Sequence, residues 1–82
     1  MAKIGARGDH EVARWRNERG DEFLLTKNGR LLQKYKGGSW KQYAKLTKDS
    51  PLMRVIKTRY RVPDEELGWL PEKLAGIGYH RV

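Results

Sequence analysis

The dipeptide Asn28-Gly29 is the strongest local constraint on what this chain can fold into. It separates residues 22–27 from residues 30–36, two runs in which apolar residues are interleaved with charged ones. Asn-Gly accommodates the two positive φ angles of a type I′ turn, whose twist matches that of an antiparallel hairpin. The sequence therefore predicts a hairpin with a two-residue loop at this dipeptide.

Candidate strands on either side extend this hairpin into a sheet. Gly37-Gly38 is a second candidate for a two-residue turn, and it leads into a strand at residues 39–46. An earlier strand is expected at residues 11–16, followed by a turn at residues 17–21. The sequence thus predicts an antiparallel meander of three to four strands over about residues 11–46.

An amphipathic helix is expected after the meander, at residues 51–61. Ser50 is a good N-cap, and Pro51 fits the first helical turn, where its missing N–H costs nothing. Apolar side chains then recur at helical spacing at Leu52, Met53, Ile56 and Tyr60. Val62-Pro63 should end the helix, because a residue before proline disfavours the helical conformation.

The C-terminal part is expected to combine short helical and strand segments. Residues 64–67 favour a short turn or helix, residues 71–75 favour another that ends at Gly76, and residues 77–82 favour an edge strand. The predicted fold class is α+β, a small antiparallel meander with one packed helix. The predicted organisation is a flexible N-terminal arm, residues 1–10, and a single compact domain, residues 11–82.

The turn lengths sort the side chains between the two faces of the predicted sheet, because successive residues of a strand point to opposite faces. Two-residue loops place Leu24, Thr26, Leu31, Gln33, Tyr35, Trp40, Gln42, Ala44 and Leu46 on one face. They place Phe23, Leu25, Lys27, Arg30, Leu32, Lys34, Lys36, Lys41, Tyr43 and Lys45 on the other. A bulge or a one-residue slip in either turn would exchange these sets.

This assignment predicts one apolar and one basic face. We expect a core of Leu24, Leu31, Trp40, Leu46, Leu52 and Ile56. We also expect Trp15, Trp69, Tyr35 and Tyr60 to be buried, because aromatic rings bury large areas in a small protein. Lys34 would lie opposite Lys41, a pairing of like charges that destabilises a sheet. A conflict of this kind is expected where function overrides stability.

Positive charge is concentrated in the middle of the chain. Residues 23–61 hold eleven Lys or Arg and one acid, a net charge of +10 from eleven minus one. Residues 1–22 balance at five bases and five acids, and residues 62–82 sum to −2 from two minus four. Lysines displace counterions from phosphates, and interleaved rings stack on bases. The sequence therefore predicts a nucleic-acid-binding protein that acts largely through phosphate contacts.

The candidate contact residues are Lys27, Arg30, Lys34, Lys36, Lys41, Tyr43, Lys45, Arg54, Lys57 and Arg61. The element order of residues 22–61, a three-stranded sheet followed by a helix, resembles the plant ethylene-response and integrase arm-binding DNA-binding domains. The likeness covers element order alone, without a shared motif. It implies a sheet face laid in the major groove. Whether the target is DNA or RNA stays open.

The alternative interpretation is a non-enzymatic protein-interaction module that docks its lysines on an acidic partner. Accessory or inhibitory proteins of mobile elements are of this kind. An apolar patch of Phe23, Leu25 and Leu32 with a basic rim would favour this alternative, whereas continuous lysines around an exposed Tyr43 would favour nucleic acid. A third interpretation is that the lysines only protect a sheet edge from aggregation.

Other function classes find little support in the 82 residues. The chain has no cysteine and only two histidines, His10 and His80, so we expect no metal site and no cofactor. No nucleophile, base and acid fall into a catalytic pattern, and we expect no enzymatic activity. No apolar run approaches the ~20 residues that span a bilayer, so we expect a cytoplasmic protein without membrane association. The oligomeric state stays open.

Overall fold

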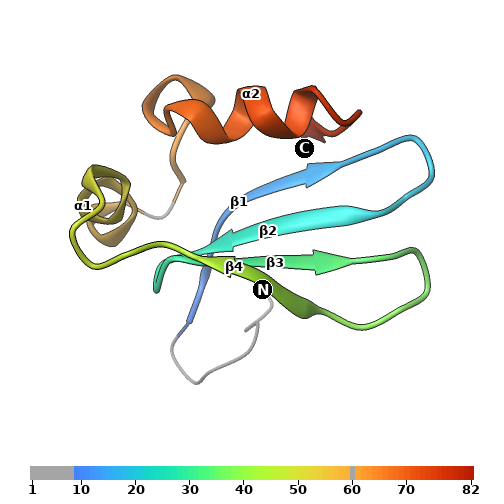
Figure 1. Ribbon diagram of the computed structural model, residues 1–82, viewed down its shortest axis with the longest axis horizontal. Helices are drawn as coiled ribbons and strands as arrows, with labels where there is room; N and C mark the ends of the chain where they lie inside the picture. Colours follow the sequence, from blue (N-terminus) through green and yellow to red (C-terminus); the bar gives the residue numbers. More distant parts are fainter. Residues whose placement is uncertain (1–8, 60) are drawn as a thin grey trace.

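The computed structural model describes residues 9–59 and 61–82 (Figure 1). Its elements in chain order are β1 (Glu11–Arg16), β2 (Glu22–Thr26), β3 (Arg30–Lys34), β4 (Lys41–Lys45), α1 (Pro51–Thr58), the 3₁₀ turn η1 (Asp64–Glu66), α2 (Trp69–Ala75) and β5 (His80–Arg81). The strands form one antiparallel sheet in the order β4-β3-β2-β1-β5. The predicted α+β class is confirmed, with five strands in the described sheet in place of the expected three to four.

The C-terminal strand supplies the additional pairing. β5 lies antiparallel to β1, with Trp15 opposite Arg81 and Arg16 opposite His80. Beyond this short ladder the Val82 N–H donates to the Arg14 carbonyl at 3.0 Å. Because β5 covers only this end of β1, the edge of β1 around Glu11 to Ala13 has no neighbouring strand in the described part of the chain.

The turn between β2 and β3 is one residue longer than the Asn-Gly signal predicted. The Gly29 N–H donates to the Thr26 carbonyl at 2.9 Å. Gly29 has φ 81°, whereas Asn28, like every described non-glycine residue, has no positive φ. These features define a three-residue loop with glycine in the left-handed region, in place of a type I′ turn. Leu24 therefore pairs with Leu32.

The turn between β3 and β4 also differs from the prediction. The Gly38 N–H donates to the Tyr35 carbonyl at 2.8 Å, and the positive φ falls on Gly37. Lys41 consequently lies opposite Gln33 and not opposite Lys34. A bulge at Tyr43 then returns the far end of the ladder to the predicted register, in which Arg30 faces Lys45.

These shifts exchange residues between the two sheet faces, so the predicted separation was wrong. The face that the helices cover carries Phe23, Leu25 and Leu31, which pack on Leu52, Met53, Ile56, Leu70 and Leu74. The opposite face, which we call the helix-free face, carries Arg14, Arg16, Glu22, Leu24, Leu32 and Lys34 by register. Leu24 and Leu32 form a small second cluster there, with Trp40 packed on it.

The core prediction was correct for four of the five aliphatic residues and mixed for the aromatic ones. Leu24, Leu31, Leu52, Ile56 and also Trp15 are buried. Leu46 and Trp40 are half-buried at the margins of the two clusters. Tyr35 and Trp69 are exposed, against the prediction, with exposed fractions of 61% and 56%. Tyr60 lies outside the described residues.

Both helices pack on one face of the sheet, α2 along the strands and α1 at their end (Figure 1). The Ser50 cap is confirmed, since its hydroxyl accepts the Leu52 N–H at 3.2 Å. α1 ends at Thr58, three residues before the predicted end, because the extended chain from Arg59 carries Val62 into the core. α2 begins at Trp69, before the predicted start, and is closed at Gly76 as expected.

Candidate nucleic-acid interface

Arginine side chains neutralise acidic groups throughout the described residues. The ion pairs join Arg14 to Glu11 and Glu22, Arg16 to Glu22, Arg19 to Asp21, Arg30 to Asp9, Arg59 to Glu66 and Arg81 to Asp64. Three of the acids, Asp9, Glu11 and Glu22, meet arginines that the register places on the helix-free face. The helix-free face is therefore a mosaic of both charges and not the uninterrupted basic surface that the sequence predicted.

Hydrogen bonds and ion pairs shift the pKa values of two of these residues, Arg14 and Asp21. The hydrogen bond from Arg14 to Glu11 raises the pKa of the arginine, with further contributions from the Glu22 carboxylate, although burial opposes the shift. The pKa of Asp21 lies below the ordinary aspartate value, chiefly because the Lys36 backbone N–H donates to its carboxylate at 3.0 Å. Asn17 donates to the same carboxylate at 3.1 Å. Each contact favours the charged form of its group.

Most of the predicted contact residues, in contrast, form no ion pair with the acids that the structure describes. Within the described residues no ion pair is made by Lys34, Lys36, Lys41, Lys45, Lys48, Arg54, Lys57 or Arg61. Arg30, in contrast, contacts Asp9 at 3.4 Å and donates to Gln42 at 3.1 Å. Arg30 is thus engaged in holding the buried Asp9.

Four predicted or neighbouring residues flank the turn of the β3–β4 hairpin, with Lys34 on the helix-free face and Lys41, opposite Gln33, on the other face. We call Lys34, Tyr35, Lys36 and Lys41 the hairpin patch. The Tyr35 ring is exposed and lies in sequence between two lysines that have no ion pair. The Lys36 N–H bond to Asp21 ties the hairpin to the neighbouring β1–β2 turn. The patch is therefore a projecting but anchored surface.

Tyr43 and Lys34, which the prediction placed together, lie on opposite sides of the sheet. The Tyr43 ring stands edge-on to Phe23 of the helix-covered face, with ring centres 5.1 Å apart. The Lys34 ammonium lies over the Trp40 ring on the helix-free face, and its strand partner is Glu22. Tyr43 keeps an exposed fraction of 57%, but it is not surrounded by the lysines that surround it in sequence.

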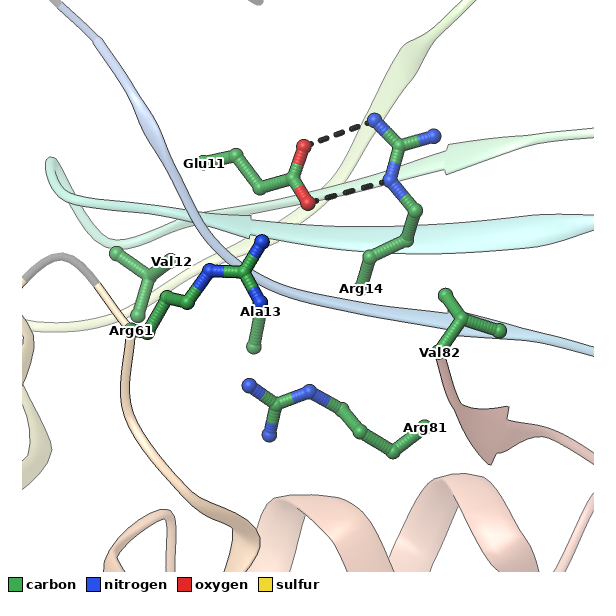
Figure 2. Close-up of a pocket in the computed structure, with 7 residues that line it drawn as sticks. All are labelled: Glu11, Val12, Ala13, Arg14, Arg61, Arg81 and Val82. Atoms are coloured by element: carbon green, nitrogen blue, oxygen red, sulfur yellow. Dashed lines mark hydrogen bonds and ion pairs between the residues drawn. The ribbon is translucent and has the colours of Figure 1, made fainter. Parts of the chain in front are cut away.

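The remaining predicted residues lie at the other end of the sheet. Arg54 and Lys57 are exposed on α1, and Lys27 belongs to the β2–β3 turn. α1 packs on that turn, because the Met53 sulfur occupies the space where a side chain at Gly29 would begin. Arg61, predicted to share the helical face, lies beyond the end of α1 and lines a cavity with Arg14 and Arg81 (Figure 2).

An apolar groove between β4 and α2 is a feature that the sequence did not reveal. Two adjoining cavities of about 270 and 80 Å³ share Leu31, Ala44, Trp69 and Leu70. Their margins carry exposed Tyr43, Trp69 and Ile77, with Lys45 and Lys73 at the two ends. The groove forms because α2 leaves the β4 side of the sheet uncovered. Exposed apolar clusters of this kind are typical of interaction sites.

Metal sites and membrane-spanning helices are two further features to consider in the described residues. Residues 9–59 and 61–82 contain no group of three or more His, Asp or Glu side chains arranged to hold a metal ion. None of the helices in these ranges is long and apolar enough to cross a membrane. The sequence matches no protein-family model, and comparison with curated proteins and with solved structures finds no significant relative. The geometry described above therefore carries the functional argument.

Proposed function

We propose that the protein binds single-stranded nucleic acid without sequence specificity, through the hairpin patch. The observation that carries this proposal is the exposed Tyr35 ring, which lies in sequence between Lys34 and Lys36, neither of which forms an ion pair within the described residues. Lysines that track a phosphate backbone beside an aromatic platform are the usual means of binding single strands. The bases of a single strand are not held in a duplex, so the exposed Tyr35 ring on this turn can stack on one of them.

The cations of α1 provide a second contact in this proposal. Arg54 and Lys57 are exposed at the opposite end of the sheet from the hairpin patch, and neither forms an ion pair within residues 9–59 and 61–82. The chain measures 32 Å along its longest axis, so a strand that reached both groups would cross the whole protein. Binding by the hairpin alone and binding by both groups differ in the number of phosphate contacts, which the salt dependence measures.

Fluorescence anisotropy with a labelled single-stranded oligonucleotide tests the proposal. Tyr35→Ser removes the platform and should weaken binding by about 1–3 kcal/mol, the usual contribution of one stacked base. The double variant Lys36→Gln/Lys41→Gln should weaken binding further at low salt. Lys73→Gln, on α2, is the control for loss of an exposed lysine elsewhere. Equal affinities for the wild type, the Tyr35 variant and the hairpin double variant would reject the hairpin patch as the contact.

A second candidate function, docking of an acidic protein segment, is favoured by the β4–α2 groove. The apolar patch expected from Phe23, Leu25 and Leu32 does not form, because all three are buried. The groove offers Trp69 and Ile77 as apolar contacts and a free edge on β4, with Lys45 and Lys73 as the complementary charges. An extended peptide with acidic and apolar residues in alternation would add a strand to β4.

Selection from a peptide library displayed on phage tests this second candidate. Acidic peptides with alternating apolar residues should be enriched, and Trp69→Ser should abolish their binding while the hairpin double variant keeps it. Enrichment without this pattern, or equal binding to the Trp69 variant, would reject the groove as the docking site. The two candidates are separable, because each names different residues.

A further inference from the structure

The cavity at the free edge of β1 is lined by three arginines and one acid. It measures about 280 Å³ and lies between the start of β1, the segment after α1 and the end of the chain. Its lining residues are Glu11, Val12, Ala13, Arg14, Arg61, Arg81 and Val82 (Figure 2). Pockets for drug-sized molecules range from about 300 to 1,000 Å³, so this cavity suits a smaller group. We call it the arginine pocket.

Arg14 and Glu11 form a fixed wall of the arginine pocket. Arg14 donates from Nη2 and Nε to the two Glu11 oxygens, at 2.9 and 3.3 Å, and from Nη1 to Glu22 at 2.7 Å. These bonds direct all three nitrogens of the guanidinium group toward carboxylates. The Glu11 carboxylate is in turn neutralised by its ion pair with Arg14. The pair thus contributes shape and a polar lining, and its positive charge is offset by the two carboxylates.

Arg81 is held in place with several donors to spare. Its Nη1 donates to Asp64 at 2.6 Å, and its guanidinium group lies 5.5 Å from the centre of the Trp15 ring. A guanidinium group has five N–H donors, so one bond to Asp64 leaves its Nε and Nη2 groups available. A positioned arginine of this kind loses little side-chain freedom when it binds an anion.

Arg61 makes no ion pair within the described residues, yet its side chain extends into the arginine pocket. Figure 2 shows the guanidinium groups of Arg61 and Arg81 on either side of the Ala13 side chain. Two guanidinium groups directed into one small cavity repel each other until an anion lies between them. Oxyanions with several oxygens match the planar fork of arginine, which forms paired hydrogen bonds with them.

We propose that the arginine pocket binds a phosphate group, held between Arg61 and Arg81. The site is distinct from the hairpin patch and does not depend on the nucleic-acid proposal. The phosphate is a single terminal group, because the cavity is too small for a phosphate with its base and sugar. The ligand is therefore either a small phosphorylated molecule or the phosphorylated end of a nucleic-acid strand.

Titration with inorganic phosphate, followed by ¹H–¹⁵N NMR, tests the site. In the wild type, the amide signals of Ala13, Arg81 and Val82 should shift in a saturable manner. Sodium chloride at matched ionic strength should not reproduce the shifts. Arg61→Gln should weaken phosphate binding about tenfold or more, the loss expected for a charge-assisted hydrogen bond. Shifts that do not saturate in the wild type would overturn the proposal.

Two further variants separate the pocket from a general effect of charge. Lys48→Gln removes one exposed cation that forms no ion pair within the described residues and lies outside the cavity, and it should leave phosphate affinity unchanged. Arg61→Lys keeps the charge but loses the fork, so its affinity should lie between those of the wild type and Arg61→Gln. Equal weakening by Lys48→Gln and Arg61→Gln would show a diffuse charge effect and would overturn the proposal.

Oligonucleotides with and without a 5′-phosphate distinguish the two ligand sources. If the strand end is the ligand, the phosphorylated oligonucleotide binds more tightly, and Arg61→Gln abolishes that advantage while leaving the unphosphorylated oligonucleotide unaffected. If both oligonucleotides bind equally, while inorganic phosphate still saturates the pocket, the ligand is a small phosphorylated molecule. Loss of oligonucleotide binding in the hairpin variants, with phosphate binding retained, would affect only the nucleic-acid proposal.

Discussion

The Lys34 ammonium lies 5.4 Å from the centre of the Trp40 ring, on the sheet face away from the helices. The Arg14 guanidinium lies 5.5 Å from the same ring. Trp40 in turn packs on Leu24 and Leu32, which are otherwise isolated from the main core. The two cations and the ring therefore close a small apolar cluster on a charged surface, an arrangement that combines cation–π attraction with burial.

Trp40→Ala should destabilise the fold because it uncovers this second cluster. The loss should be less than the ~3–5 kcal/mol typical of a fully buried tryptophan, since Trp40 is only half-buried. Urea unfolding followed by circular dichroism measures the change as a lower midpoint. Trp69→Ala is the matched control, because Trp69 is exposed, and it should move the midpoint much less. Equal midpoints for the two variants would contradict the assigned role of Trp40.

Gly29→Ala should be more destabilising than Gly37→Ala. Both glycines have similar positive φ values, 81° and 78°, so both substitutions carry the cost of a left-handed L-residue, about 1–2 kcal/mol. A Cβ at Gly29 also overlaps the Met53 sulfur, whereas nothing lies within 4 Å of a Cβ at Gly37. The difference between their thermal midpoints thus isolates the contact of α1 with the turn. If Gly37→Ala proved the more destabilising, that contact would not exist.

The stability of the fold should fall in acid partly through Asp21. The pKa of this carboxyl is lowered in the folded state from its ordinary value of 3.8 by the Lys36 N–H and Asn17. Its contribution is therefore complete above the unfolded-state pKa and is lost as the pH falls through the lowered folded-state pKa. Asp21→Asn should reduce the pH dependence of unfolding below about pH 4. An unchanged pH dependence in Asp21→Asn would contradict this role of the carboxylate.

Local sequence signals predicted the strands and helices well, because each of these signals depends on a few neighbouring residues. The bounds of β1 and the Ser50 cap follow from residue type and spacing alone. The register failed because Asn28-Gly29 also suits a three-residue loop, which the Thr26 hydroxyl supports by accepting the Arg30 N–H at 3.2 Å. The extra residue in this loop exchanged the β2 side chains between the faces, and the one-residue shift at the β3–β4 turn separated Lys41 from Lys34.

The candidate sites were predictable only where they are local in sequence. The hairpin patch is a continuous segment apart from Lys41, so charge and turn signals could find most of it. The arginine pocket needs the pairing of β5 with β1 and the path of the chain after α1, which no short-range pattern encodes. The exposure of Trp69 likewise depends on how α2 leaves β4 uncovered, and residue type alone had favoured burial.

The salt dependence of binding to a single-stranded oligonucleotide tests the central claim most directly. The logarithm of the affinity should fall linearly with the logarithm of the salt concentration, by about 0.7 for each phosphate contact. Lys36→Gln/Lys41→Gln should reduce both the slope and the affinity at low salt, and Arg54→Gln/Lys57→Gln, which removes the same charge, reports whether α1 also contributes. The account predicts tight, salt-sensitive binding that depends on the hairpin pair. Absence of binding at ~50 mM salt, where electrostatic attraction is only weakly screened, or an unchanged slope in the hairpin variant, would contradict it.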